Sequence, residues 1–310
     1  MRKYNVSDKA ICHPTMFKTL LKKYLLGFVL TFVGYTFLNW FFSTHFDLSI
    51  NDNYTNFGIP AVICIVLTYV VFRPIVNFLR YSEKASDFLL WFILPFTIWT
   101  PIAFSQGYFK DISYKIVKIN KPGDLFNHLN ERFFKIRKFD VAPEDYFLIR
   151  ERHSSGKNGT TLNVSNYYIV PMYNDSSEKN MTSLTQIGYG VRFSTSMHNG
   201  FFDKEINDTL IKEFNVKSAK DFREYDFENV SYFEKIENND DAKYFKEAIE
   251  NNNNFDKTQQ NLVIVNRKGR IEDLYERGKN MFLHSTLICL GIGLTTLLLI
   301  NLFSDKKPSR

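Results

Sequence analysis

Several common features of enzymes and of secreted scaffolds are missing from this sequence. Its 310 residues include three cysteines, too few for a disulfide-stabilised scaffold, and no Cys and His residues have the spacing of a zinc site. The six histidines contain no pair four residues apart, so there is no metalloprotease motif. A glycine-rich phosphate-binding loop is also missing. We therefore predict no catalytic residues, no metal site and no cofactor from motifs.

Acidic and basic residues are also missing from four long apolar stretches. These stretches hold 19, 16, 17 and 23 residues, and a helix needs about 20 residues to cross about 30 Å of hydrocarbon. Overall, 45% of the chain is apolar and 16% is aromatic, which excludes a disordered protein. We expect four transmembrane helices, at residues 24–42, 57–72, 88–104 and 281–303.

The net charge of +6 is unevenly distributed along the chain. Residues 1–106 carry nine basic and five acidic side chains, residues 107–279 carry 27 of each, and residues 280–310 carry three and one. Because nucleic acids attract concentrated positive charge, the neutral central region predicts no nucleic-acid partner. Basic residues beside apolar helices stay on the cytoplasmic side of a membrane. We therefore expect both termini in the cytoplasm and residues 107–279 outside a bacterial inner membrane.

These patterns divide the chain into a membrane region at 1–106, an extramembrane domain at 107–279, and a final helix with a basic tail at 280–310. The expected fold class is α+β, a mixed or antiparallel sheet with a few helices, on an α-helical anchor. Runs of β-branched and aromatic residues predict strands at 112–119, 132–141, 146–152, 162–172, 186–193, 230–236 and 262–266. Helices are expected at 203–214, 219–225 and 240–250, the last capped by Asp240 or Asp241.

Two local groups suggest chemistry, and each has a simpler interpretation. His153, Ser154, Ser155 and Lys157 cluster in one loop and suit a serine nucleophile with its base. No third residue is specified to orient the base, so a solvated hairpin loop is the better explanation. Gly188 and Gly190 are two residues apart, but the third glycine and the following helix of a dinucleotide motif are missing. A bulge or close packing is expected at these glycines.

Small residues follow one another along two of the expected membrane helices. Ser285, Cys289 and Gly293 are spaced four apart in the last helix, and Gly27 and Gly34 are spaced seven apart in the first. Such stripes let helix backbones approach closely. They predict that the last helix packs against the first three or against another subunit.

From residue 98 onward the chain resembles a region of bacterial membrane proteins labelled rhomboid-like. The segments that carry the resemblance are residues 98–109, 131–141, 168–173, 232–236 and 245–249. Rhomboid peptidases require a serine in a Gly-x-Ser-x-Gly-type motif in one span and a histidine in another, and no span here has that motif. The resemblance therefore implies the non-catalytic portion of such proteins and transfers no active-site residue.

These observations favour a non-enzymatic, multipass membrane protein that presents a soluble α+β domain for protein–protein interaction or scaffolding in the bacterial envelope. Its expected partners are the lipid bilayer and another envelope protein or a second copy of itself. One alternative is a membrane-bound hydrolase with an active site in 107–279, and another is a channel or membrane-disrupting effector. Clustering of His153, Ser155 and carboxylates in one pocket would favour the enzyme. An exposed apolar patch or an open sheet edge would favour the binding protein.

Overall fold

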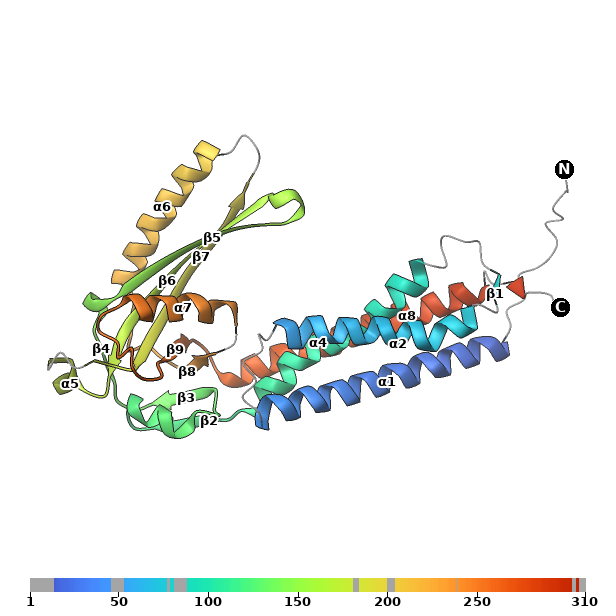
Figure 1. The fold of residues 1–310 in the computed structure, drawn as a ribbon, viewed down its shortest axis with the longest axis horizontal. Helices are drawn as coiled ribbons and strands as arrows, with labels where there is room; N and C mark the ends of the chain where they lie inside the picture. The colour runs from blue at the N-terminus through green and yellow to red at the C-terminus, as the bar shows by residue number, and fades with distance from the viewer. Residues whose placement is uncertain are drawn as a thin grey trace. The chain divides into compact units, whose positions relative to one another are not determined.

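A computed structural model of the chain describes residues 14–45, 53–76, 79–80, 88–180, 184–199, 204–237, 239–302 and 305–306 (Figure 1). The chain divides into two compact units. Met1–Ser113 and Glu272–Arg310 form the first, called here the helical unit, and Tyr114–Ile271 form the second, called the α+β unit. The α+β unit begins seven residues after the expected boundary at 107 and ends eight residues before the expected boundary at 279.

The helical unit contains α1 (Pro14–His45), α2 (Ile59–Val76), α4 (Leu94–Ser113) and α8 (Ile271–Leu302), with the π-helical turns η1 (Tyr54–Gly58) and η2 (Leu89–Ile93) and the short strands β1 (Leu79–Arg80) and β10 (Asp305–Lys306). In the described chain, three helical segments are long and apolar enough to cross a membrane. These segments are Phe17–Phe42, Tyr54–Val71 and Ile271–Asn301.

The expectation of four such helices is corrected to three. Residues 88–104 are helical, but the helix α4 continues to Ser113 and includes Gln106, Lys110 and Asp111, which make it less apolar. Nine residues of α4 are buried, and it packs against both α1 and α2. The lower apolarity of α4 comes from the part beyond Gln106, where Lys110 and Asp111 are half-buried and Ser113 is exposed.

The α+β unit is an open, mixed sheet with helices on its faces (Figure 1). Its strands are β2 (Ile116–Ile119), β3 (Phe133–Ile136), β4 (Asp140–Val141), β5 (Phe147–Ser155), β6 (Thr161–Tyr173), β7 (Ile187–His198), β8 (Tyr232–Ile236) and β9 (Leu262–Arg267). The order is β2-β3-β8-β9-β7-β6-β4, and β5 also pairs with β6. The pairs β2–β3 and β7–β9 are parallel and the others are antiparallel. The mixed α+β class expected from the sequence is therefore confirmed.

The helices of this unit are α5 (Ser176–Asn180), α6 (Lys204–Arg223) and α7 (Asp240–Asn251), with short 3-10 turns η3 (Pro122–His128), η4 (Pro143–Asp145) and η5 (Lys157–Gly159). Two predictions are wrong here. Residues 203–214 and 219–225 do not form separate helices, because α6 continues through the residues between them. The cap of α7 is Asn239, whose side chain accepts a 2.9 Å hydrogen bond from the backbone of Ala242, and not Asp240 or Asp241.

Two apolar cores lie on opposite faces of the sheet. Tyr168, Tyr189 and Phe233 belong to the core on the face that also receives Phe222 of α6. The second core contains Tyr167, Ile169, Ile236, Val263 and, from α7, Phe245, Ala248 and Ile249. Neighbouring residues of a strand point to opposite faces, so the nearly continuous apolar pattern of β6 and β9 follows from having a core on each side. These faces are called the α6 face and the α7 face below.

Candidate functional site

The longest strands of the sheet, β6 and β7, divide into a buried half and an outer half. Residues 164–173 of β6 and 187–191 of β7 are buried, whereas residues 192–198 of β7 alternate between exposed and half-buried. The outer half of β6 is the shorter stretch 161–163, and β5 pairs with β6 over residues 161–169, which includes all of it. The outer halves of β6 and β7, together with β5, form a three-stranded ribbon that carries most of the exposed polar side chains considered below.

The strand β5 is a sheet edge. It is nine residues long, pairs with β6 on one side, and packs against α7 on one face. Among the residues that the structure describes, no strand pairs with its other side. Four of its side chains are exposed: Arg150, Arg152, His153 and Ser154. An edge of this length offers unpaired backbone donors and acceptors to another chain.

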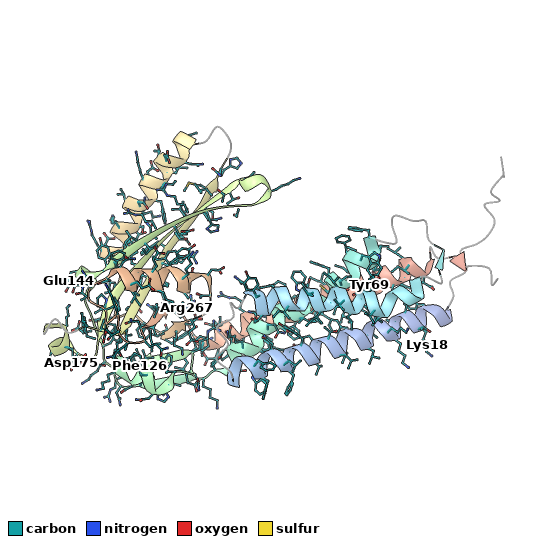
Figure 2. The ribbon with its side chains drawn as sticks, viewed as in Figure 1. Lys18, Tyr69, Phe126, Glu144, Asp175 and Arg267 are labelled. Atoms are coloured by element: carbon teal, nitrogen blue, oxygen red, sulfur yellow. The ribbon has the colours of Figure 1, made fainter. Side chains whose placement is uncertain are left out.

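The other edges of the sheet are protected differently. At the β4 end, Lys179 of α5 donates a 2.9 Å hydrogen bond to the carbonyl oxygen of Val141, and its ammonium group lies 3.3 Å from the carboxylate of Glu144. Figure 2 shows Glu144 and Asp175 at this end of the sheet. At the opposite end, β2 is only four residues long and η3 packs against it. Short edge strands and a lysine at the edge commonly protect a sheet against unwanted strand pairing. The strand β5, with nine residues, is not a short edge strand.

Polar side chains gather on the α7 face of the outer ribbon, where the sequence had suggested a nucleophile and a base. His153 and Ser155 both lie on this face, opposite Asn163 and Thr161 of β6. The Asn163 amide donates a 2.7 Å hydrogen bond to Ser155 Oγ and lies 3.4 Å from His153 Nε2. Ser196 of β7 in turn donates to Asn163 Oδ1 at 2.7 Å. His153 and Ser155 therefore share the Asn163 amide as a partner, an arrangement that lacks the base-to-nucleophile hydrogen bond of a catalytic pair.

A second polar cluster stands where the α7 N-terminus meets the ribbon. The Tyr167 hydroxyl donates a 2.8 Å hydrogen bond to Asp241, and Arg192 donates a 3.0 Å hydrogen bond to the same carboxylate. The guanidinium of Arg192 also lies over the Tyr167 ring, 5.4 Å from its centre. Burial, and then the nearby Asp241 carboxylate, raise the pKa of the Tyr167 phenol. A tyrosine that stays protonated and bonded in this way fixes the first turn of α7 on the sheet.

One carboxylate is buried on the α7 face at the other end of the sheet. Glu234 of β8 is 5% exposed and accepts hydrogen bonds from Arg132 at 2.9 Å and from Arg267 at 2.5 Å. Figure 2 labels Arg267. Burial alone would raise the pKa of Glu234, but the charges of Arg132 and then Arg267 outweigh burial, so the pKa lies below its usual value. The sequence analysis did not predict this buried ionic group. Two charged residues, Glu234 and Lys235, within an apolar strand could have indicated it.

The two strand glycines allow close packing. A Cβ atom on Gly190 would lie 2.8 Å from Cε1 of Phe245, and one on Gly188 would lie 2.5 Å from Cδ1 of Ile169. Both glycines lie inside the regular strand β7, on the face covered by α7. The close packing expected from the sequence is confirmed. Nothing in the surroundings of the two glycines supports a dinucleotide-binding motif.

The small residues expected to pack helices have different environments in the helical unit. A Cβ on Gly293 would overlap the hydroxyl group of Tyr24, and one on Gly27 would lie 3.3 Å from Leu67. Cys289 is buried. By contrast, a Cβ on Gly34 would meet nothing within 4 Å. The remaining member of the two stripes, Ser285, is half-buried and donates a 2.9 Å hydrogen bond to the carbonyl oxygen of Phe282 in its own helix.

Comparison of the chain with protein-family models, with curated proteins and with solved structures gave no match. The resemblance to rhomboid-like proteins therefore stays a prediction, and the function has to be inferred from the residues themselves. No group of three or more His, Cys, Asp or Glu residues that could hold a metal ion occurs in the described part of the chain.

Proposed function

We propose that this chain is a multipass membrane protein of the bacterial envelope whose α+β unit binds another protein and does not itself perform catalysis. The observation that carries the proposal is the nine-residue edge strand β5, exposed beside an otherwise well-packed sheet. In an isolated soluble protein such an edge is a liability, because it promotes aggregation. A partner that pairs with it explains why an edge of this length is present.

The anchoring part of the proposal is supported by the polarity of the helical unit. Its exposed side chains include many large apolar residues, such as Leu25, Leu26, Val29 and Leu30 of α1. Polar groups lie inside: Tyr24 donates a 3.0 Å hydrogen bond to Thr97, and the buried Gln106 accepts one from Asn39 at 2.9 Å. An apolar surface around hydrogen-bonded polar groups suits a lipid environment, where unpaired polar groups are costly.

The proposal is tested by site-specific photo-crosslinking of the full chain in membranes of a bacterial host. A photoreactive amino acid replaces Ser154 on β5 in one strain and Lys246, an exposed residue of α7, in a control strain. We expect Ser154 to give a discrete crosslinked product with another polypeptide and Lys246 to give none. Equal products from both sites, or no product from Ser154, would contradict a binding role for β5.

A further inference from the structure

We propose that β5 receives an extended segment of a different protein, and that this segment carries acidic residues at alternate positions opposite Arg150 and Arg152. The inference rests on the proposed function, because it names the site and the partner chemistry of the same interaction. Its basis is the charge pattern along the exposed edge.

The two arginines project from the same face of β5, because they are two residues apart. Both are exposed, and across the pairing with β6 they stand opposite the uncharged residues Asn166 and Val164. Neither arginine forms an ion pair with any residue in the described ranges. The sheet itself therefore leaves this pair of positive charges without a neutralising partner.

The acidic residue between them lies on the opposite face of the strand. Glu151 points to the α7 face, where it stands opposite Ser165 of β6. Arg150 and Arg152 point to the α6 face, because neighbouring residues of a strand point to opposite faces. The charge that the α6 face of β5 offers to an approaching strand is therefore positive.

An added strand would place its side chains directly beside those of β5. Residues opposite each other in neighbouring strands have Cβ atoms about 4.5–5.5 Å apart, and opposite charges at such positions attract. Because Arg150 and Arg152 lie on one face, the matching acidic residues must be two positions apart in the partner. The backbone hydrogen bonds of strand addition supply affinity, and these side-chain pairs supply selectivity.

A second copy of this chain does not suit the edge. If two copies of β5 paired antiparallel in one continuous sheet, a central residue would face its own counterpart. Pairing centred on Arg150, Glu151 or Arg152 brings arginine opposite arginine in each case, and like charges directly opposite destabilise a strand pair. The two ends of this chain do not match the charge of the edge either. Residues 1–13 carry three basic residues and one acidic residue, and residues 303–310 carry the same numbers.

The proposal is tested with the full chain in lipid nanodiscs and three fluorescent nine-residue peptides of alternating Thr or Val and charged residues. The first peptide has Glu at every second position, the second has Lys at those positions, and the third is the Glu peptide with alternate backbone nitrogens methylated. We expect the Glu peptide to bind in a fluorescence anisotropy titration, and each of the other two to bind at least about ten-fold more weakly. Equal binding of the Glu and Lys peptides would overturn the acidic partner, and equal binding of the methylated peptide would overturn strand addition.

Charge-reversed variants separate this inference from the proposed function. The double variant Arg150→Glu/Arg152→Glu should weaken binding of the Glu peptide by about ten-fold or more, and it should also reduce the Ser154 crosslink in membranes. The matched control Lys212→Glu/Lys246→Glu makes the same change of net charge at exposed positions of α6 and α7 and should alter neither. A Ser154 crosslink that persists at full yield in Arg150→Glu/Arg152→Glu would overturn the acidic partner while leaving β5 as a binding strand. A crosslinked product consisting of two copies of this chain would overturn the inference as well.

Discussion

The helical unit and the α+β unit distribute polarity in opposite ways. In the α+β unit, aromatic residues such as Tyr168 and Phe233 form the interior and charged residues such as Arg150 lie outside. In the helical unit, Leu30 is 62% exposed, whereas Gln106 is 2% exposed and hydrogen-bonded. The same chain thus contains one unit with an apolar interior and a polar surface, and one with an apolar surface around hydrogen-bonded polar groups. The difference teaches that exposure alone does not measure the cost of a substitution, because the cost depends on the solvent of each unit.

The largest expected effect concerns the core of the α+β unit. Phe245 is 1% exposed and fits over Gly190. Replacing it in Phe245→Ala removes a large buried ring and leaves a cavity, so the free energy of unfolding of the α+β unit should fall by about 3–5 kcal/mol. Urea-dependent proteolysis of the full chain measures this loss. The neighbouring exposed residue provides the control, since Lys246→Ala should change the unfolding free energy by less than about 0.5 kcal/mol.

The comparison is tested most directly by giving both units the same change at exposed apolar residues. Leu30 in α1 is 62% exposed and Val216 in α6 is 72% exposed. If the helical unit lies in lipid, Leu30→Asp should cost about 3–4 kcal/mol of insertion free energy, and Val216→Asp should cost less than about 0.5 kcal/mol of unfolding free energy. Resistance of the chain to extraction from membranes at alkaline pH reports the first, and urea-dependent proteolysis reports the second. Similar small effects at both positions would mean that the helical unit is not surrounded by lipid.

A smaller effect is expected at the buried carboxylate of the α+β unit. Glu234→Gln removes the negative charge between Arg132 and Arg267, and we expect a loss of about 2 kcal/mol, less than for a fully buried ion pair because the side chain of Arg267 is 48% exposed. Because the folded-state pKa is lowered, the stabilisation is present above the unfolded-state pKa of about 4.3 and is lost as the pH falls through the folded-state value. Unfolding free energies measured from pH 7 to pH 3 should therefore fall more steeply for the unsubstituted chain than for Glu234→Gln. If the unfolding free energies of the two chains fall in parallel with pH, Glu234 does not contribute to the pH dependence of stability.

The smallest effect is expected at Gly34 of the helical unit, and Gly293 of the same unit serves as its comparison. Gly34→Ala adds a methyl group where nothing lies within 4 Å and should stabilise α1 by about 0.5–1 kcal/mol. Gly293→Ala should instead destabilise the helical unit by about 1–3 kcal/mol, because the new methyl group overlaps the hydroxyl group of Tyr24, which bonds Thr97. Thermal unfolding in detergent micelles distinguishes the two directions. A stabilising Gly293→Ala would show that close packing does not require this glycine.

Much of the α+β unit could be predicted from the sequence because its strands have strong local patterns. The strands expected at 162–172 and 262–266 differ from β6 and β9 by one residue at one or both ends. The helix α6 was divided in error, since its mean composition is polar and its buried positions include the polar residues Asn207 and Ser218 as well as Ile211 and Phe222. Periodicity is a weak signal in such a helix.

The candidate site was less predictable because it depends on strand order. The sequence placed a strand at 146–152 but gave no indication that it would be the edge of the sheet, since β4 and β5 both pair with β6 at different places along its length. The contact of Tyr167 with Asp241 joins residues 74 positions apart. Local patterns carry little information on such pairings, which are fixed by the register of the whole sheet.

The division of β6 and β7 into buried and outer halves also implies a gradient of backbone protection. Amide hydrogens at 187–191 lie in a part of β7 that is buried on both faces, whereas those at 192–198 lie where side chains alternate between half-buried and exposed. Local opening requires less free energy where fewer apolar contacts are lost. Deuterium should therefore enter β7 from its His198 end and advance toward Ile187, and a strand added along β5 would slow that advance before it altered any other part of the protein.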